Sequence, residues 1–437
     1  MAKRVVITGL GVLTPLGTSP EEFWEASLRG KAGYGKLTGL DKLPLKSRVA
    51  GRIPDFEPLG GTARQEARDR MGRPAFLAVN AAIRAVLDAG LRPEDEDRER
   101  FGVCVANAIA DTPFSESAYL AITAEASAPL RGGTELPLYQ KGMFAPIALE
   151  VAHEFGLQGE ALVMSTGCTG GIDAVGYGFE SIAGGEHDLM LCGASEAPIS
   201  YMTVSSFDAI GALTTHFNDE PERASRPFDR KRSGFVLSEG CAMLLLEELE
   251  HAVRRGAPIY GEITGFSSKN NCYHMTDLPE DGDALHLTMQ EALQRAGRRP
   301  DEIQYINAHG SSTPQNDLFE TMAYKKTFGE AAYSIPISST KSMTGHPLSA
   351  ASAIEIAHCL LAMREGMIPP TINQEERDPA CDLNYVPNEP LPRRLDVVLT
   401  NASGFSGLHS AMVLARLPEE AEAAAAAERE GLRETAV

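Results

Sequence analysis

The sequence predicts an α/β protein made of two similar halves. Apolar runs rich in β-branched residues recur along its 437 residues, and helix-length amphipathic segments lie between many of them. Nearly continuous apolar strands that alternate with helices are typical of sheets covered on both faces. A short pattern also occurs twice, because "VMSTGC" (163–168) and "ISSTKSMTGH" (337–346) each lead from a strand through Thr-Gly into a helix. A duplicated α/β unit is the simplest explanation of this repetition.

The expected strands are eight apolar runs, which begin at Arg4, Phe101, Ala161, Asp188, Ile259, Ile303, Ile335 and Leu395. The expected helices include "PAFLAVNAAIRAVLDAG" (74–90), which ends in a glycine, and the segment from Cys168 to the glycine pair 184–185. Another is "PLSAASAIEIAHCLLAMREG" (347–366), in which Pro347 suits the first turn and Gly366 suits the stop.

We place the two halves at residues 1–255 and 256–417. Within the first half, residues 110–142 contain several Pro and Gly and predict an irregular insertion that serves as a cap or a subunit contact. The tail, residues 418–437, is rich in Ala and Glu and has no apolar face, so we expect it to be solvated and disordered.

Composition excludes several classes of protein. A formal net charge of -20 argues against nucleic acid as the main partner, because phosphate binding needs a basic surface. No apolar run approaches the roughly 18 residues of a membrane span, and "MAKRVVITGLG" carries no secretory leader. The 7 cysteines form no C-x-x-C pair, which indicates a reducing compartment and argues against a zinc site. We therefore expect a soluble cytoplasmic protein.

Cys168 lies where a strand gives way to a helix. A free cysteine is often a small buried hydrophobe, but a helix start can also lower the pKa of a thiol and make it a nucleophile. Its surroundings alone leave both roles open and favour the structural one. The helix that follows contains Gly170, Gly171, Gly176 and Gly178, each of which costs roughly 1 kcal/mol relative to Ala. We expect another backbone to pack closely there.

Three further loops after strands carry reactive side chains. His309 lies in "YINAHGSSTPQND", and Lys341 and His346 lie in "SSTKSMTGHP". A structural imidazole is the alternative role for His309, and Lys341 should be partly buried and paired. Its partner is Glu355 if that acid is buried; otherwise Glu355 faces solvent. Phe405 lies between two glycines in "NASGFSGLHSAMV", where an aromatic ring could swing as a gate.

Nucleotide and metal cofactors are not expected. The sequence has no P-loop, and "GLGVLTPLG" lacks the spacing of a dinucleotide-binding fingerprint.

One cysteine, two histidines and one lysine, each on a loop after a strand, resemble the active-site set of β-ketoacyl-acyl carrier protein synthases of the thiolase fold. The segments "RVVITGLGVLTPLG", "ASRPFDRKRSGFVLSEGCAMLLLEELEHAVRRGA", "YINAHGSSTPQND", "STKSMTGHPLSAASAIEIA" and "NASGFSGLHSAMVL" match that family in order and spacing, from Arg4 to about Leu417. The resemblance implies two duplicated α/β halves in a five-layered αβαβα arrangement.

Within the family, the chain is most similar to the catalytic ketosynthase subunit of bacterial type II polyketide synthases. The segments that carry this likeness include "VMSTGCTGGIDAVGYG", "SSFDAI", "YHMTDL" and "DLNYVP". The fatty-acid β-ketoacyl-acyl carrier protein synthase II is the alternative. A chain length factor, the non-catalytic partner subunit, is less similar because it lacks the nucleophilic cysteine. A degradative thiolase would carry a second, late cysteine, which "NASGFSGLHS" does not contain.

The resemblance implies a decarboxylative Claisen condensation. Cys168 would hold an acyl chain as a thioester, and the backbone N–H groups of Cys168 and Phe405 would form the oxyanion hole. His309 and His346, as neutral imidazoles, would donate to the thioester oxygen of the enolate that malonyl-acyl carrier protein leaves when it loses CO₂.

Lys341, tied to Glu355, would orient His309 by the same resemblance. Phe405 would open and close the entry for the malonyl group.

The partners implied are acyl- and malonyl-loaded acyl carrier protein, and docking of an acidic carrier needs a basic patch. Similar enzymes place such contacts where this chain has Arg64, Arg68, Arg70 and Arg73. The alternative is a solvated helix, because Glu66 and Asp69 are interleaved. The polyketide assignment implies a heterodimer with a chain length factor, and the fatty-acid assignment implies a homodimer.

The chain departs from the family pattern at three positions. Gly170 stands where the family usually has Ser in Cys-Thr-Ser-Gly, and Ser349 replaces a glycine in Gly-His-x-Leu-Gly. Ser406 interrupts the Gly-Phe-Gly-Gly loop. None of these changes removes a reacting group, but they bear on the gate and on the shape of the acyl pocket.

Overall fold

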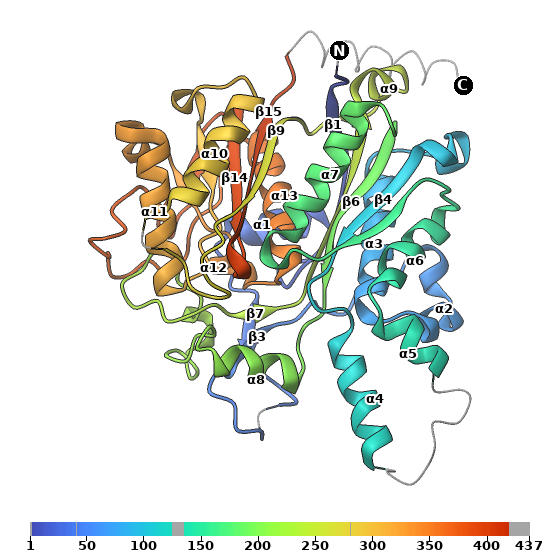
Figure 1. The fold of residues 1–437 in the computed structure, drawn as a ribbon, viewed down its shortest axis with the longest axis horizontal. Helices are drawn as coiled ribbons and strands as arrows, with labels where there is room; N and C mark the ends of the chain where they lie inside the picture. The colour runs from blue at the N-terminus through green and yellow to red at the C-terminus, as the bar shows by residue number, and fades with distance from the viewer. Residues whose placement is uncertain (1, 41, 125–134, 280, 419–437) are drawn as a thin grey trace.

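A computed structural model of the chain describes residues 2–40, 42–124, 135–279 and 281–418. The tail expected at 418–437 lies outside these ranges except for its first residue, and so does part of the predicted insertion. Within the described part, ten strands form one hydrogen-bonded sheet in the order β11-β10-β14-β15-β9-β1-β8-β6-β4-β5 (Figure 1).

The sheet consists of two copies of one topology. The strands of the first half are β1 (Val5–Leu13), β4 (Phe101–Ala106), β5 (Ala161–Met164), β6 (Leu189–Glu196) and β8 (Gly240–Glu248). Those of the second half are β9 (Gly261–Asn270), β10 (Tyr305–Asn307), β11 (Ile337–Ser338), β14 (Val397–Ser403) and β15 (Leu408–Ala415). In each half, three parallel strands at the outer edge are followed by two antiparallel ones. The prediction of duplicated halves is therefore confirmed.

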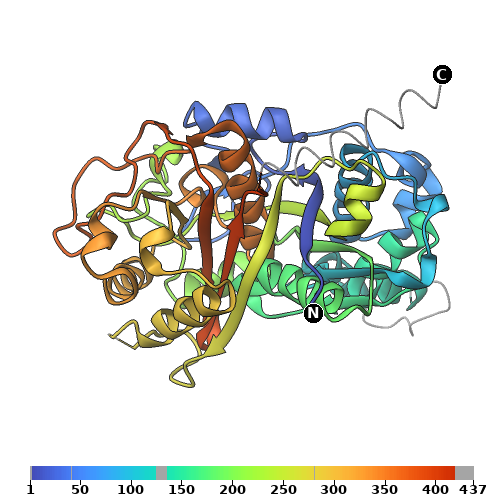
Figure 2. The same cartoon turned by 90° about the horizontal axis from the view of Figure 1, so that it is seen from above.

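The halves join where the start of β1 pairs with β9 through Val5–Ile7 (Figure 2). The boundary that the sequence places at residues 255–256 falls between α9 (Leu249–Arg254) and β9, and it stays a prediction.

Five layers follow from where the helices pack. The central layer is α7 (Gly170–Gly184) and α13 (Ser349–Glu365), which contact each other and strands of both halves (Figure 1). The outer face of the first half is covered by α3 (Arg73–Asp88) and α6 (Ala145–Phe155). The outer face of the second half is covered by α10 (Asp283–Arg295) and α11 (Pro314–Phe328). This is the αβαβα arrangement that the family resemblance implies.

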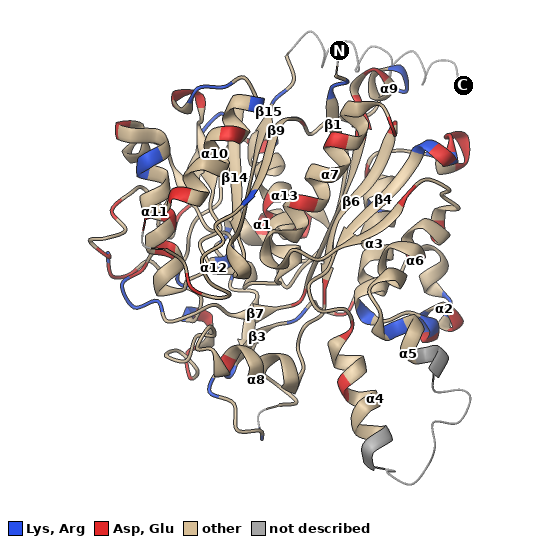
Figure 3. Ribbon diagram, in the orientation of Figure 1, with Lys and Arg blue, Asp and Glu red and all other residues tan. Residues whose placement is uncertain are grey.

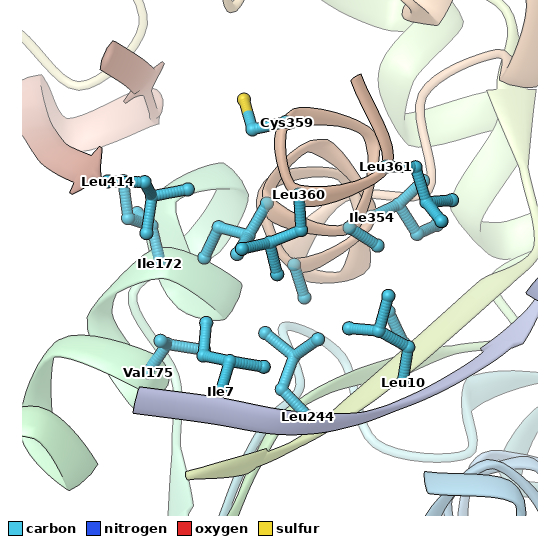
Figure 4. Close-up of a cluster of buried hydrophobic side chains, with 14 of the residues drawn as sticks. Ile7, Leu10, Ile172, Val175, Leu244, Ile354, Cys359, Leu360, Leu361 and Leu414 are labelled. Carbon is cyan, nitrogen blue, oxygen red and sulfur yellow. The ribbon is translucent and has the colours of Figure 1, made fainter. Parts of the chain in front are cut away.

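The largest core lies around the central helices. Helix α13 is buried along its length from Ser349 to Met363, and its buried residues include the polar Ser349, Ser352, Glu355 and His358 among mostly apolar ones. Its side chains, with Ile172 and Val175 of α7, meet Leu10 of β1 and Leu244 of β8 (Figure 4). The core therefore fixes the starts of both central helices against the sheet.

Glycine allows the two central helices to touch. A Cβ atom built on Gly171 would lie 2.5 Å from the backbone N of Ala353 and 2.7 Å from the carbonyl O of Ser349. Because no side chain fits in that space, the close backbone packing expected around the helix glycines is confirmed at Gly171.

Two sequence-based predictions of local structure are wrong. The expected irregular insertion contains the helices α4 (Thr112–Ala124) and α5 (Glu135–Gly142). Pro113 starts α4 rather than breaking it, because Asp111 accepts from the Phe114 N–H at 3.1 Å and so caps the helix. Helix α13 begins at Ser349 and not at Pro347, since Leu348 has a φ of 44°. The glycine stop expected at Gly366 is confirmed by its left-handed φ of 64°.

No helix in the described ranges is long and apolar enough to cross a membrane.

Candidate active site

Four loops bring the predicted site residues together. Cys168 lies in the turn Gly167–Thr169 between β5 and α7, and His309 follows β10. Lys341 and His346 lie between β11 and α13, and Phe405 follows β14. These strands are parallel within each half, so their carboxyl ends meet at one edge.

One cavity of about 330 Å³ is lined by Cys168, His309, His346 and Phe405. Its wall is largely apolar and includes Phe207, Ile210, Ala212, Phe235 and Leu348. Polar residues line it as well, among them Thr276, Asp277, Gln315 and Asn316. The apolar part of the wall suits an acyl chain that ends at a reacting sulfur.

The two histidines are neutral. Their ring centroids lie 5.3 Å apart, and both side chains are buried. Burial, followed by the positive charge of Lys341, holds the pKa of each imidazole well below its ordinary value. Both rings therefore offer an N–H donor without carrying a charge.

Lys341 determines which nitrogen of His309 carries the proton. Its Nζ donates to the His309 carbonyl at 2.7 Å and lies 3.3 Å from His309 Nδ1. An ammonium group is only a donor, so Nδ1 is the acceptor and Nε2 carries the hydrogen.

Glu355 is buried and accepts a hydrogen bond from Lys341 Nζ, so the structure shows the paired arrangement and not a solvent-facing glutamate. Burial raises the pKa of Glu355 to about 8, although Lys341 lowers it.

Cys168 is a thiol rather than a thiolate. Burial raises its pKa to about 11, and the opposing effects of Lys341 and of the Phe405 backbone N–H are smaller. The lowered pKa expected from the helix start is therefore wrong for this cavity, because desolvation outweighs the helix-start donors.

The backbone around the sulfur supplies hydrogen-bond donors. The N–H groups of Cys168 and Phe405 both bond to the sulfur and lower its pKa. The preceding residue packs closely, since a Cβ on Gly404 would lie 3.4 Å from the Cys168 nitrogen. Two N–H groups that converge on one point are the arrangement that stabilises an oxyanion at a thioester carbon.

Phe405 stands at the cavity wall and is 37% exposed. Ser406, which interrupts the glycine loop, has a φ of 65° and donates from its N–H to the Met275 carbonyl at 2.7 Å. A non-glycine residue in this left-handed conformation costs free energy, so the Met275 contact helps to fix the loop that carries Phe405.

Sequence reasoning missed Glu320 on α11. Its carboxylate accepts from the backbone N–H groups of His309 and Gly310 at 2.7 and 2.8 Å and from Asn401 at 2.7 Å. The acid is buried and holds the His309 loop in place. In the sequence Glu320 resembles any other helical glutamate. The only feature that could have indicated its role is its position eleven residues after His309, in the helix that follows the histidine loop.

Two of the four predicted docking arginines are bound within the chain. Arg70 makes a two-bond ion pair with Glu150 at 2.9 and 2.7 Å. Arg73 makes another with the buried Glu239 at 2.7 and 2.8 Å. Their charges are largely neutralised, so these two residues are poor candidates for docking.

The other two arginines remain candidates. Arg64 and Arg68 are exposed at α2 (Gln65–Arg70), where basic residues gather (Figure 3). The Arg68 guanidinium donates only to backbone carbonyls, of Thr62 at 2.9 Å and Ala63 at 3.1 Å, within the described residues. Both side chains can therefore meet an acidic partner.

Comparison with known proteins gives one family. A model described as β-ketoacyl synthase, N-terminal domain, matches residues 2–252, and one described as β-ketoacyl synthase, C-terminal domain, matches residues 260–375. The tetracenomycin polyketide synthase ketoacyl synthase alpha subunit of Streptomyces glaucescens is 46% identical over 96% of this chain and 98% of its own length. The 3-oxoacyl-[acyl-carrier-protein] synthase 2 of Coxiella burnetii is 39% identical over 95% and 99%.

Solved structures agree. A type II polyketide synthase acyl-carrier protein in complex with its ketosynthase bound to the hexaketide matches with a TM-score of 0.88 and 41% identity, over 95% of this chain and 100% of that one. The ishigamide ketosynthase/chain length factor matches with a TM-score of 0.87 and 33% identity, over 96% and 100%.

Proposed function

The chain belongs to the β-ketoacyl synthase family, and we propose that it is the condensing ketosynthase subunit of a type II polyketide synthase. It extends an acyl chain by decarboxylative Claisen condensation with malonyl-acyl carrier protein. The observation that carries this proposal is the single cavity in which the Cys168 sulfur meets two neutral imidazoles and two convergent backbone N–H groups.

The first step is acyl transfer. The Cys168 sulfur attacks the acyl-carrier thioester, and the negative oxygen that forms lies against the N–H groups of Cys168 and Phe405. The carrier thiolate leaves and takes up the proton that the Cys168 thiol gave up. His346 lines the same cavity and is the imidazole able to carry that proton between the two sulfurs, because Nδ1 of His309 already accepts from Lys341.

The second step forms the carbon–carbon bond. Malonyl-carrier protein loses CO₂, and the electron pair of the broken bond becomes an enolate on the thioester. His309, through Nε2–H, and His346 donate to the enolate oxygen, so they stabilise charge as it develops. The enolate carbon attacks the Cys168 thioester and expels the Cys168 sulfur as a thiolate, so the β-ketoacyl chain leaves on the carrier. The thiolate then takes up a proton from solvent and returns to the thiol.

Two protein partners follow from this function. Acyl carrier protein delivers both substrates and docks at Arg64 and Arg68. A chain length factor forms the heterodimer, and support comes from the likeness to the ishigamide ketosynthase/chain length factor. We place the protein in the cytoplasm, because all seven cysteines are free.

The test is reconstitution with the co-expressed partner subunit. Wild-type enzyme with acyl- and malonyl-carrier protein should give a β-ketoacyl-carrier product by mass spectrometry, with an acyl adduct on Cys168. Cys168→Ala should keep the fold and lose the product. Full condensation by that variant would refute the assignment.

A fatty-acid synthase role is the second candidate, which the 39% identity to the Coxiella 3-oxoacyl-[acyl-carrier-protein] synthase 2 favours. That role requires a homodimer active without a partner subunit. The same assay with the chain alone therefore separates the two candidates.

A further inference from the structure

Two serines at the start of α13 hold the two peptide units that flank Cys168. Ser349 Oγ donates to the Gly167 carbonyl at 2.9 Å, and Ser352 Oγ donates to the Cys168 carbonyl at 3.2 Å. Both serines are buried, and neither lines the substrate cavity. The two serines therefore contact the turn Gly167–Thr169 from outside the substrate cavity.

The Ser349 contact acts on the peptide unit that contains the Cys168 N–H. The Gly167 carbonyl and the Cys168 N–H belong to one planar trans peptide, so they point in opposite directions. Gly167 has a φ of 63°, and a Cβ built there would meet nothing within 4 Å among the residues described. The carbonyl accepts from the Gly170 N–H as well as from Ser349. These two bonds set the direction of the N–H on the other side.

Gly170 leaves the space that Ser349 occupies. A Cβ built on Gly170 would lie 3.0 Å from both Cβ and Oγ of Ser349, and 2.9 Å from the Cβ of Ala106.

Glu196 lies on the far side of Ser349. Its buried carboxyl accepts from the Ala108 N–H at 2.5 Å and from the backbone and side chain of Ser349. One hydroxyl proton serves one acceptor at a time, so Glu196 and Gly167 compete for it while the carboxyl is ionised. Burial raises the pKa of Glu196 to about 8. A protonated Glu196 would donate to Ser349 and leave the Ser349 proton for Gly167.

We propose that Ser349 is a positioning residue for acyl transfer: its hydroxyl orients the Gly167–Cys168 peptide so that the Cys168 N–H meets the oxyanion. Gly170 is its necessary companion, because a side chain there would displace Ser349. The inference rests on the proposed function, since it assumes an acyl transfer to Cys168.

The first experiment compares two reactions of Cys168 in Ser349→Ala. Acylation by acyl-carrier protein should slow by about tenfold or more with KM unchanged, a loss below the ~10²–10³ of a deleted oxyanion donor. Alkylation by iodoacetamide develops no oxyanion and loses only the small effect of the Cys168 N–H on the thiol pKa, so its rate should fall much less than the rate of acylation. Thr288→Val is the matched control, because Thr288 is equally buried and its hydroxyl donates to the Ala284 carbonyl at 2.7 Å within α10. It should change neither rate.

The second experiment tests the coupling of the two positions. Gly170→Ser alone should slow acylation more than Gly170→Ser combined with Ser349→Gly. In the double variant the side chain at position 170 no longer meets Ser349, and the new serine side chain on α7 supplies the hydroxyl that Ser349 supplied before. Wild-type acylation by Ser349→Ala would overturn the inference, as would an equal loss of acylation and alkylation. A wild-type enzyme that never acylates Cys168 would overturn the proposed function and this inference with it.

Discussion

At the scale of single residues, the chemistry depends on groups kept uncharged by burial. The imidazoles of His309 and His346 stay neutral, and the Cys168 thiol keeps its proton. A neutral site accepts an apolar chain at little electrostatic cost, and charge appears only in the transition states. The residue-scale predictions follow from this neutrality.

Alkylation of Cys168 should show a raised pKa. In the free enzyme the rate with iodoacetamide should rise about tenfold per pH unit from pH 7 to pH 10, because only the thiolate reacts and its fraction grows until the pKa of about 11. Rates measured at constant ionic strength, with the adduct located by mass spectrometry, check this. The cysteine of a short peptide with blocked ends has a thiol pKa of about 8.5, so its alkylation rate should level off about one pH unit above that value. A plateau for Cys168 below pH 9 would contradict the prediction.

Lys341 should matter for both stability and catalysis. Lys341→Met leaves Glu355 buried without its partner, which should lower the free energy of unfolding by about 3 kcal/mol in urea denaturation. Adding Glu355→Leu should restore much of that stability. It should not restore kcat, because the donor that fixes the proton on His309 Nε2 is still missing. A double variant with wild-type kcat would show that Lys341 acts only through Glu355.

The sequence predicted which residues gather at the cavity better than it predicted their supports. Cys168, His309 and His346 each follow an apolar strand, and that position is visible in the sequence. Glu320 and Glu196 are buried acids whose role depends on which backbone N–H groups approach them in space. No local pattern separates such an acid from a solvent-facing one, so their roles required the structure.

At the scale of elements, the crossing of α7 and α13 fixes the site. The first residues of α7 follow the nucleophile, and the first residues of α13 hold its peptide units. The sequence predicted both helices and the close packing at the glycines. It failed for α4, because a proline read as a break stands in the first helical turn.

Gly171→Ala should be severely destabilising. The added methyl group would meet backbone atoms of Ala353 and Ser349 at 2.5 and 2.7 Å, and backbone cannot move aside as a side chain can. We expect a loss of at least about 3 kcal/mol of unfolding free energy or no soluble protein. Gly184→Ala is the matched control in the same helix, where the new Cβ meets nothing within 4 Å. It should be neutral or stabilise by up to about 1 kcal/mol.

At the scale of the whole molecule, the two copies of the fold have different tasks. The first half supplies Cys168, the proposed nucleophile, after β5. The second half supplies both histidines, Lys341 and Phe405 after β10, β11 and β14. The site exists only where the two halves meet. Duplication was visible in the sequence, but the exact meeting of the four loops depends on helix packing across the layers.

Docking of the carrier protein should depend on Arg68. Arg68→Glu should raise KM for carrier-bound substrates several-fold and leave KM for a small acyl thioester unchanged, because only the carrier meets α2. Arg299→Glu, an exposed arginine in the second half, is the control and should affect neither. Equal effects of Arg68→Glu on both substrates would reject docking at this surface.

Strand β5 ends the ten-stranded sheet, and its four residues, Ala161–Met164, are apolar and only partly buried, with Leu162 37% exposed. In the ranges that the structure describes, β5 pairs only with β4 in this sheet, and a short apolar edge strand with unpaired main-chain groups favours strand addition from another polypeptide. When this chain is expressed without the proposed chain length factor subunit, much of it should therefore be found in inclusion bodies. Co-expression of both subunits in equal amounts should keep it in the soluble fraction of the lysate.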